Sequence, residues 1–176
     1  MGRYAVFLRG VNVGGINIKM ADLRAALKTL PLATFSTLLA SGNIACTAKA
    51  SAPELKELVE ALLRERFGYD AWVVVFTAAE VDAAIKACPY PADSPLLHSY
   101  ITLSSEPGVL DELETLGSAL EDTELVRIAP RALAWQAPVG GSLASPFSKL
   151  SAKAKYKSTT TTRNLRTLLK VRDALA

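Results

Sequence analysis

The sequence has few of the residues that most often build disulfide frameworks, metal sites and catalytic centres. Its only cysteines are Cys46 and Cys88, and its only histidine is His98. Two cysteines far apart in sequence, without a Cys or His at ligand spacing, are typical of small buried side chains in a reducing compartment. We therefore expect both thiols to be reduced, and we expect neither a metal site nor a cofactor.

Long apolar runs are also missing. No stretch approaches the roughly 20 apolar residues of a membrane-spanning helix, and the N-terminus has no basic segment followed by an apolar signal core. Hydrophobic residues nevertheless make up 50% of the 176 residues, enough to bury a core in one compact domain or in two small subdomains. These features predict a globular, cytoplasmic protein with no membrane contact.

No catalytic motif is present. His98 follows the apolar pair Leu96 and Leu97, and no nearby residue supplies a nucleophile or a metal partner. The sequence therefore assigns no catalytic residue, and it favours a structural or surface role for His98. Trp72 and Trp135 both fall in expected strands, where packing is the favoured role.

Charge is distributed unevenly along the chain. Residues 1–148 contain 12 Lys and Arg against 16 Asp and Glu, whereas residues 149–176 contain 8 against Asp173 alone. The C-terminal end is therefore strongly basic although the net charge is only +3. Such a segment favours an anionic partner, or else it complements the acidic remainder of the same molecule.

The stretch Arg9–Met20 connects an apolar strand to an amphipathic helix through a loop rich in Gly and Asn. Tyr4–Leu8 is aromatic and β-branched, and apolar residues recur at helical spacing after Met20. Glycines allow positive φ and expose backbone N–H groups, while Arg9 and Lys19 place a cation at each end of the loop. The loop fits neither G-x-G-x-x-G nor the nucleotide-binding P-loop, so it indicates an anion site, or a tight connection, without naming a ligand.

The first half of the chain predicts a ferredoxin-like unit. Residues 33–39 and 44–47 are expected strands about the turn Ser41–Asn43, Ser51 and Glu54 form a capping box for a helix that ends at Gly68, and residues 71–76 are a buried strand. With the first strand and helix, the order is βαββαβ. We expect residues 1–88 to form an α+β subdomain in which a four-stranded antiparallel sheet has both helices on one face.

The second half restarts as β-α-β-β and predicts a smaller α+β subdomain over residues 96–176. Strands are expected at 99–103, 124–128 and 132–136, with a helix over 109–120. Residues 138–162 are rich in Gly, Ser, Thr and Lys and are expected to form a long polar loop, with or without one helical turn. A final helix is expected to be capped by Thr161 or Thr162 and to leave Arg163 in solvent.

Two motifs are familiar: Phe7–Gly15 together with Lys19–Arg24, and Ser41–Asn43 downstream. They resemble a family of uncharacterised bacterial proteins called domain of unknown function 1697, which has similar short motifs where this chain has Ser148–Leu150 and Thr162–Asn164. The resemblance implies a two-part α+β protein beginning with a ferredoxin-like unit, and it implies no activity. This chain differs at Leu165, where the family usually has Trp.

These observations favour a small binding protein for an anionic ligand, such as a nucleotide, a nucleic acid or another phosphate. The expected ligand-binding residues come from the loop, the turn and the basic segment: Arg9, Asn12, Gly14, Gly15, Lys19, Ser41, Asn43, Lys149, Arg163 and Asn164. Two alternatives stay open: a small enzyme acting on a phosphorylated or carboxylated metabolite, and a protein-interaction module without a small ligand.

Overall fold

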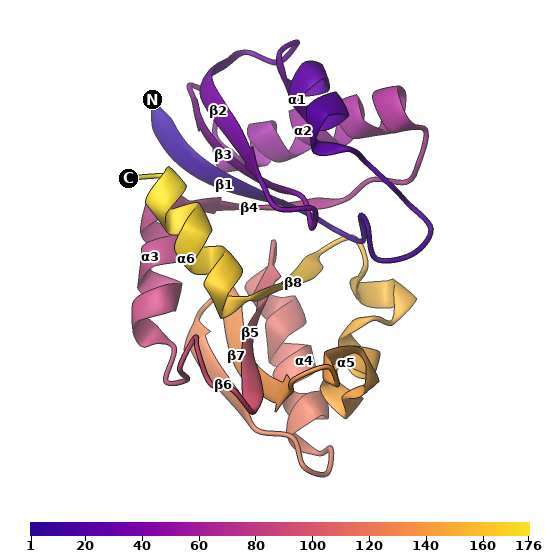
Figure 1. Ribbon diagram of the computed structural model, residues 1–176, viewed down its shortest axis with the longest axis vertical. Coiled ribbons are helices and arrows are strands. Elements are labelled where there is room, and N and C mark those ends of the chain that lie inside the picture. Colours follow the sequence, from indigo (N-terminus) through magenta and orange to yellow (C-terminus); the bar gives the residue numbers. More distant parts are fainter. The chain divides into compact units, whose positions relative to one another are not determined.

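The computed structural model describes residues 1–176 and consists of two compact units (Figure 1). The first contains Met1–Asp82 and Lys170–Ala176, and the second contains Ala83–Leu169. No helix combines the length and the hydrophobicity that crossing a membrane requires. That residues 1–88 and 96–176 fold as separate subdomains stays a prediction.

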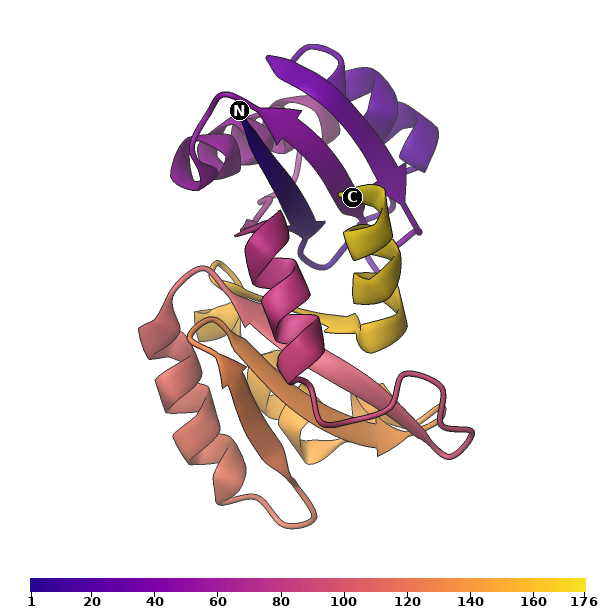
Figure 2. The ribbon, with the colours of Figure 1, turned by 90° about the vertical axis from the view of Figure 1, so that its left-hand side faces the viewer.

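The first unit is a ferredoxin-like α+β fold, as its element order predicted. Its antiparallel sheet has the order β2-β3-β1-β4, formed by β1 (Gly2–Leu8), β2 (Leu32–Leu38), β3 (Asn43–Ala48) and β4 (Val73–Thr77). The helices α1 (Met20–Leu27) and α2 (Ala52–Phe67) lie together behind this sheet in Figure 2. Between helices and sheet lies a core of buried aliphatic side chains that includes Val6, Leu8, Leu23, Ile44, Leu55, Leu63 and Val75.

Local signals fix both ends of α2 and the start of α3. The Ser51 hydroxyl accepts from the Glu54 backbone N–H, the Glu54 carboxylate accepts from the Ser51 N–H, and Gly68 ends α2 with φ of 66°. Thr77 and Glu80 form the same reciprocal pair before α3 (Ala78–Ala87). The predicted Ser51 and Glu54 capping box is confirmed, and the structure shows a second box of the same spacing at Thr77 and Glu80.

The second unit repeats the strand order of the first. Its antiparallel sheet has the order β6-β7-β5-β8, formed by β5 (Leu97–Ser104), β6 (Leu125–Ala129), β7 (Ala132–Pro138) and β8 (Thr160–Asn164). The helices α4 (Pro107–Ser118) and α5 (Pro146–Ser151) lie on one side of it (Figure 1). In sequence order, β5 to β8 therefore occupy the positions that β1 to β4 occupy in the first sheet.

The prediction of a long polar loop over residues 138–162 is wrong. This stretch contains a 3₁₀ turn at Ser142–Ala144, α5, a second 3₁₀ turn at Ala154–Tyr156, and the start of β8. Phe147 and Tyr156 are almost completely buried and pack in one cluster with Trp135 and Leu113. These widely spaced apolar side chains anchor the segment to the core although its composition is polar.

The predicted start of the last helix is also wrong. The helix α6 spans Leu165–Ala174, and the Asn164 side-chain oxygen accepts from the Arg166 backbone N–H at its first turn. Thr161 and Thr162 lie in β8 instead, where β-branched residues are favoured. Arg163 is only 6% exposed, because it belongs to this strand and donates to the Thr161 hydroxyl at 2.8 Å and the Thr162 carbonyl at 3.0 Å.

Trp135 has the packing role that its place in a strand predicted. It is 3% exposed, stacks on Tyr100 with 4.8 Å between ring centroids, and meets Phe147 edge-on. Its indole N–H donates to Thr102 Oγ1 at 3.0 Å, so the one polar atom of the ring is satisfied. His98 is half-buried near the start of β5, and its Nδ1 atom lies 3.3 Å from the hydroxyl of Tyr100 in the same strand.

Both thiols are free, and we expect Cys46 to react more slowly than Cys88 with an alkylating reagent. Burial raises the pKa of Cys46 to about 11, and it also raises the pKa of half-buried Cys88. Since only a thiolate is a nucleophile, a raised pKa slows alkylation at pH 8. Timed iodoacetamide labelling with peptide mass analysis measures both rates. Equal rates in the folded protein, or an intramolecular bridge before labelling, would contradict this expectation.

Candidate functional site

The loop over residues 9–19 is held in shape by the side chain of Asn12. The Asn12 side-chain amide donates to the Ile18 carbonyl at 3.0 Å, and the side-chain oxygen accepts from the Ile18 N–H at 3.0 Å. The backbone N–H of Asn12 donates to the Ile16 carbonyl at 2.7 Å. Asn12 has φ of 58°, a conformation that Asn tolerates better than most residues. The loop is therefore an ordered structure held by its own hydrogen bonds, and Val11 and Ile16 form an isolated parallel bridge within it.

The turn at residues 39–42 lies against this loop. The Asn12 amide donates to the Ala40 carbonyl at 2.6 Å, and the Leu8 N–H donates to the Gly42 carbonyl at 2.9 Å. Gly42 is buried, with φ of 83°, and a Cβ built on it would lie 2.8 Å from Val11 Cγ2. The structure thus brings together two of the three segments predicted to bind a ligand.

Arg9 is at the base of the loop, directly after β1. Its backbone N–H donates to the Trp72 carbonyl at 3.0 Å, which extends the β1-β4 pairing by one residue. Its side chain is half-buried, and desolvation lowers the pKa of the guanidinium. An arginine remains charged at neutral pH despite such a shift, so the base of the loop carries a partly desolvated cation.

The tip of the loop is open to solvent. Gly14 and Gly15 are exposed, have φ of 88° and 80°, and donate no hydrogen bond from their backbone N–H groups within the protein. Lys19 is exposed at the N-cap position of α1, and no side chain caps this helix. Backbone N–H groups and a lysine at an uncapped helix start are groups that anions accept as partners.

Ser41 and Asn43 brace the turn from within. The Asn43 amide donates to the Leu38 carbonyl and to the Ser41 hydroxyl, both at 2.9 Å, and Asn43 is fully buried. The side chains of Asn12 and Asn43 thus bond to backbone groups and, for Asn43, also to the Ser41 hydroxyl, and the sequence alone could not reveal those partners. Contact of either residue with a ligand stays a prediction.

The other predicted residues lie in the second unit. Lys149 is exposed near the end of α5, Arg163 is buried in β8, and Asn164 caps α6. That these three residues share a site with the Arg9–Lys19 loop stays a prediction.

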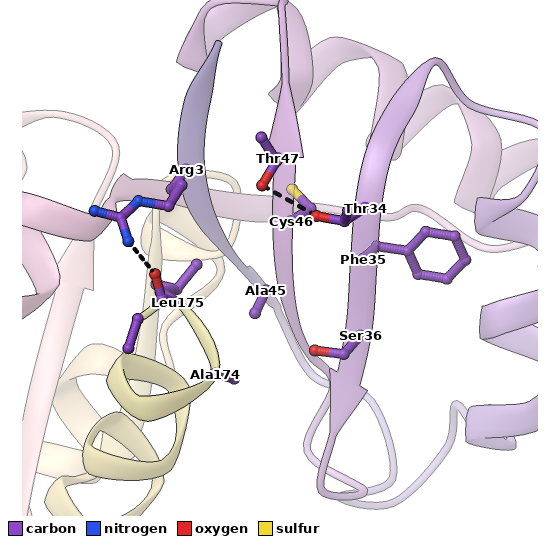
Figure 3. Close-up of a pocket in the computed structure, with 10 residues that line it drawn as sticks. Arg3, Thr34, Phe35, Ser36, Ala45, Cys46, Thr47, Ala174 and Leu175 are labelled. Carbon is purple, nitrogen blue, oxygen red and sulfur yellow. Dashed lines mark hydrogen bonds between the residues drawn. The ribbon is translucent and has the colours of Figure 1, made fainter.

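A pocket of ≈ 270 Å³ in the first unit contains none of the predicted residues (Figure 3). The Arg3 guanidinium donates to the Leu175 carbonyl at 2.7 Å, and the Thr34 hydroxyl donates to the Thr47 hydroxyl at 3.1 Å on its sheet wall. Ser36 adds another hydroxyl beside Thr34. The alternation of Thr34 and Ser36 in β2 was the only signal of this surface in the sequence.

The chain is similar over 99% of its length to the conserved bacterial protein SP0830 from Streptococcus pneumoniae, of which it covers 98%, with a TM-score of 0.80 and 24% sequence identity. At that identity the similarity shows the fold alone. No curated protein sequence matches the chain.

A family model, described as a protein of unknown function (DUF1697), matches residues 1–133. The match includes the Arg9–Lys19 loop and the turn at residues 39–42, whereas the C-terminal motifs Ser148–Leu150 and Thr162–Asn164 lie beyond it. Because the matched residues are more than half of the chain, this chain belongs to the DUF1697 family of proteins of unknown function.

Proposed function

We propose that the first unit binds a phosphate-bearing ligand at the Arg9–Lys19 loop. The length of the connection between β1 and α1 carries this proposal. In the second unit, Ser105 and Glu106 alone connect the first strand to the first helix, whereas the same connection in the first unit is the whole segment from Arg9 to Lys19. The ferredoxin-like topology therefore does not need a loop of this length, and extra ordered loop is commonly functional.

The chemistry of the loop favours an anion over other ligands. Arg9 and Lys19 are cations at its two ends, and the exposed N–H groups of Gly14 and Gly15 lie between them in sequence. No acidic residue occurs between Arg9 and Met20. A phosphate can accept from a guanidinium, an ammonium and backbone N–H groups together, and charge-assisted hydrogen bonds of this kind are the stronger ones.

Preorganisation supports the same proposal. The Asn12 side chain links the loop to Ile18 and to the turn at Ala40, so the loop does not have to be ordered when a ligand binds. Binding then avoids part of the entropy cost of fixing a flexible segment. The proposal accordingly gives ligand contacts to Arg9, Lys19 and the glycine backbone, and it gives Asn12 the role of a brace.

The double substitution Arg9→Ala and Lys19→Ala tests this proposal. We expect wild-type protein to bind inorganic pyrophosphate or mixed mononucleotides with an affinity that falls as salt increases, and we expect the double variant to bind at least about tenfold more weakly, since it loses two charged contacts. Isothermal titration calorimetry at two salt concentrations measures both effects.

The matched control is Arg24→Ala with Lys28→Ala, which removes the same charge from exposed positions on or next to α1. It should bind like the wild type, and the melting temperature of each variant shows whether it is folded. The proposal fails if wild-type protein binds none of these phosphates, or if the control loses as much affinity as the loop variant.

A further inference from the structure

In three of the four outer strands of the two sheets, charged side chains form hydrogen bonds with the strand's backbone. On β4, the Val73 N–H donates to Glu60 Oε1 at 3.1 Å, and the Val73 carbonyl accepts from Lys56 Nζ at 2.6 Å. The Trp72 carbonyl points toward β1, because it accepts from the Arg9 N–H. Successive residues of a strand point their backbone N–H and C=O groups to opposite sides, so those of Val73 point away from β1. The Ala71 carbonyl accepts from Arg64 at 2.9 Å, so α2 covers this edge with three charged residues.

The outer strands of the second sheet have similar protection. In β6 the register shifts between Arg127 and Ala129, and the Arg127 guanidinium donates to the carbonyls of Ala129 at 3.0 Å and Pro130 at 2.6 Å. In β8 the Arg163 guanidinium donates to the Thr162 carbonyl at 3.0 Å. Bulges and charged side chains at an edge are the devices by which proteins prevent further strand pairing.

The fourth outer strand, β2, lacks this protection. It has 7 residues where the other three have 5 each, and it contains no charged residue and no proline. No charged side chain bonds to its backbone; Arg24 reaches only the Thr37 hydroxyl, and the Asn43 amide reaches the Leu38 carbonyl at its end. Its only irregularity is at its beginning, between Leu32 and Thr34. A long uncharged edge of this kind is a template for another strand.

We propose that β2 pairs in antiparallel fashion with β2 of a second copy of this chain, about a two-fold axis at Phe35. The strand reads LATFSTL, so this register places Phe35 opposite Phe35 and Thr34 opposite Ser36. No like charges meet, and Thr or Ser pairs and aromatic pairs are favourable across antiparallel strands. Figure 3 shows Thr34 and Ser36 on the same side of β2, opposite to Phe35, so each pair meets on one face of the joined sheet.

A second copy fits this edge better than an unrelated partner. The edge presents no charge that would select an oppositely charged peptide. When two copies of β2 pair about a two-fold axis, the same strand supplies the missing backbone hydrogen-bond partners in both copies. The inference is independent of ligand binding, because the Arg9–Lys19 loop supplies none of the residues in this strand.

Sedimentation velocity of the full-length protein from about 1 to 200 μM tests the proposal, a range that covers the micromolar affinities of weak dimers. Two double variants then test the register. Thr34→Lys with Ser36→Lys places like charges opposite each other in both pairs, whereas Thr34→Lys with Ser36→Glu places opposite charges there. We expect a wild-type dimer, a loss of affinity of at least about tenfold in the first variant, and a dimer close to wild type in the second.

Circular dichroism melting checks that both variants are folded, and both positions are exposed at the strand edge. A wild-type protein that remains monomeric over the whole range overturns the proposal. So does a dimer that both variants weaken equally, or that neither variant weakens, because the contact would then lie elsewhere or have another register.

Discussion

The substitution Gly42→Ala is expected to lower the free energy of unfolding by about 2–4 kcal/mol, because it combines backbone strain with overpacking. Gly42 has φ of 83°, where an L-residue with a Cβ is disfavoured. The added methyl would lie 2.8 Å from Val11 Cγ2 and 2.9 Å from Leu8 Cβ, and both of those side chains are at most 1% exposed. Urea unfolding followed by circular dichroism measures the change.

The matched control is Gly68→Ala, in the same unit. Gly68 has φ of 66°, but no atom lies within 4 Å of the position of its Cβ. This variant should lose only about 1–2 kcal/mol, the cost of the left-handed conformation. The difference between the two variants then measures the close packing of the turn against Leu8 and Val11. If Gly42→Ala costs no more than Gly68→Ala, the turn is not held tightly against the loop.

The sequence predicted the first unit well because its signals are local or follow from chain connectivity. The Ser51 and Glu54 capping box, and Gly68 after α2, act through contacts within a few residues. The strand order then followed from βαββαβ connectivity, since right-handed crossovers leave few ways to arrange four strands. The buried run at Val73–Phe76 completed the sheet as an apolar stretch should.

The strand β8 was not predicted, because its buried residues are polar. Thr160, Thr161 and Arg163 are all at most 6% exposed in β8. Hydrogen bonds compensate for the burial: Thr162 Oγ1 lies 2.9 Å from Thr102 Oγ1, and Thr160 Oγ1 donates to the Tyr156 carbonyl at 2.9 Å. A hydrophobic pattern cannot reveal a strand of this kind, since its burial depends on partners that are distant in sequence.

In the candidate site too, the local backbone conformation could be predicted from the sequence, but the hydrogen-bond partners could not. The Gly and Asn content of the loop predicted positive φ, and Gly10, Asn12, Gly14 and Gly15 all have it. The sequence could not show that the Asn12 amide bonds to Ile18 and Ala40, because residue type indicates hydrogen-bonding capacity but not the partner. The expected strand over 99–103 and helix over 109–120 already indicated a short connection after β5, but no residue-level repeat marked the two sheets as equivalent.

The substitution Glu60→Ala is expected to lower the free energy of unfolding by about 2–4 kcal/mol, because it leaves a buried N–H group unsatisfied and removes the partner of a partly buried ammonium group. Glu60 is 6% exposed, and its carboxylate accepts from both the Lys56 ammonium and the Val73 N–H. Alanine would leave the Val73 N–H without its acceptor and the Lys56 ammonium without its counter-charge at the edge of β4. Urea unfolding measures the loss.

Two further variants separate the causes of this loss. Glu60→Gln keeps an oxygen that can accept from Val73 while it removes the charge, so it should lose less than Glu60→Ala. Glu57 also lies on α2, but its carboxylate is exposed and makes no hydrogen bond. Glu57→Ala should therefore change the free energy of unfolding by no more than about 0.5 kcal/mol. A cost for Glu60→Ala as small as that for Glu57→Ala would show that α2 does not hold the β4 edge through its charged side chains. A large cost together with a raised tendency to self-associate would show that these side chains both stabilise β4 and keep its edge from pairing.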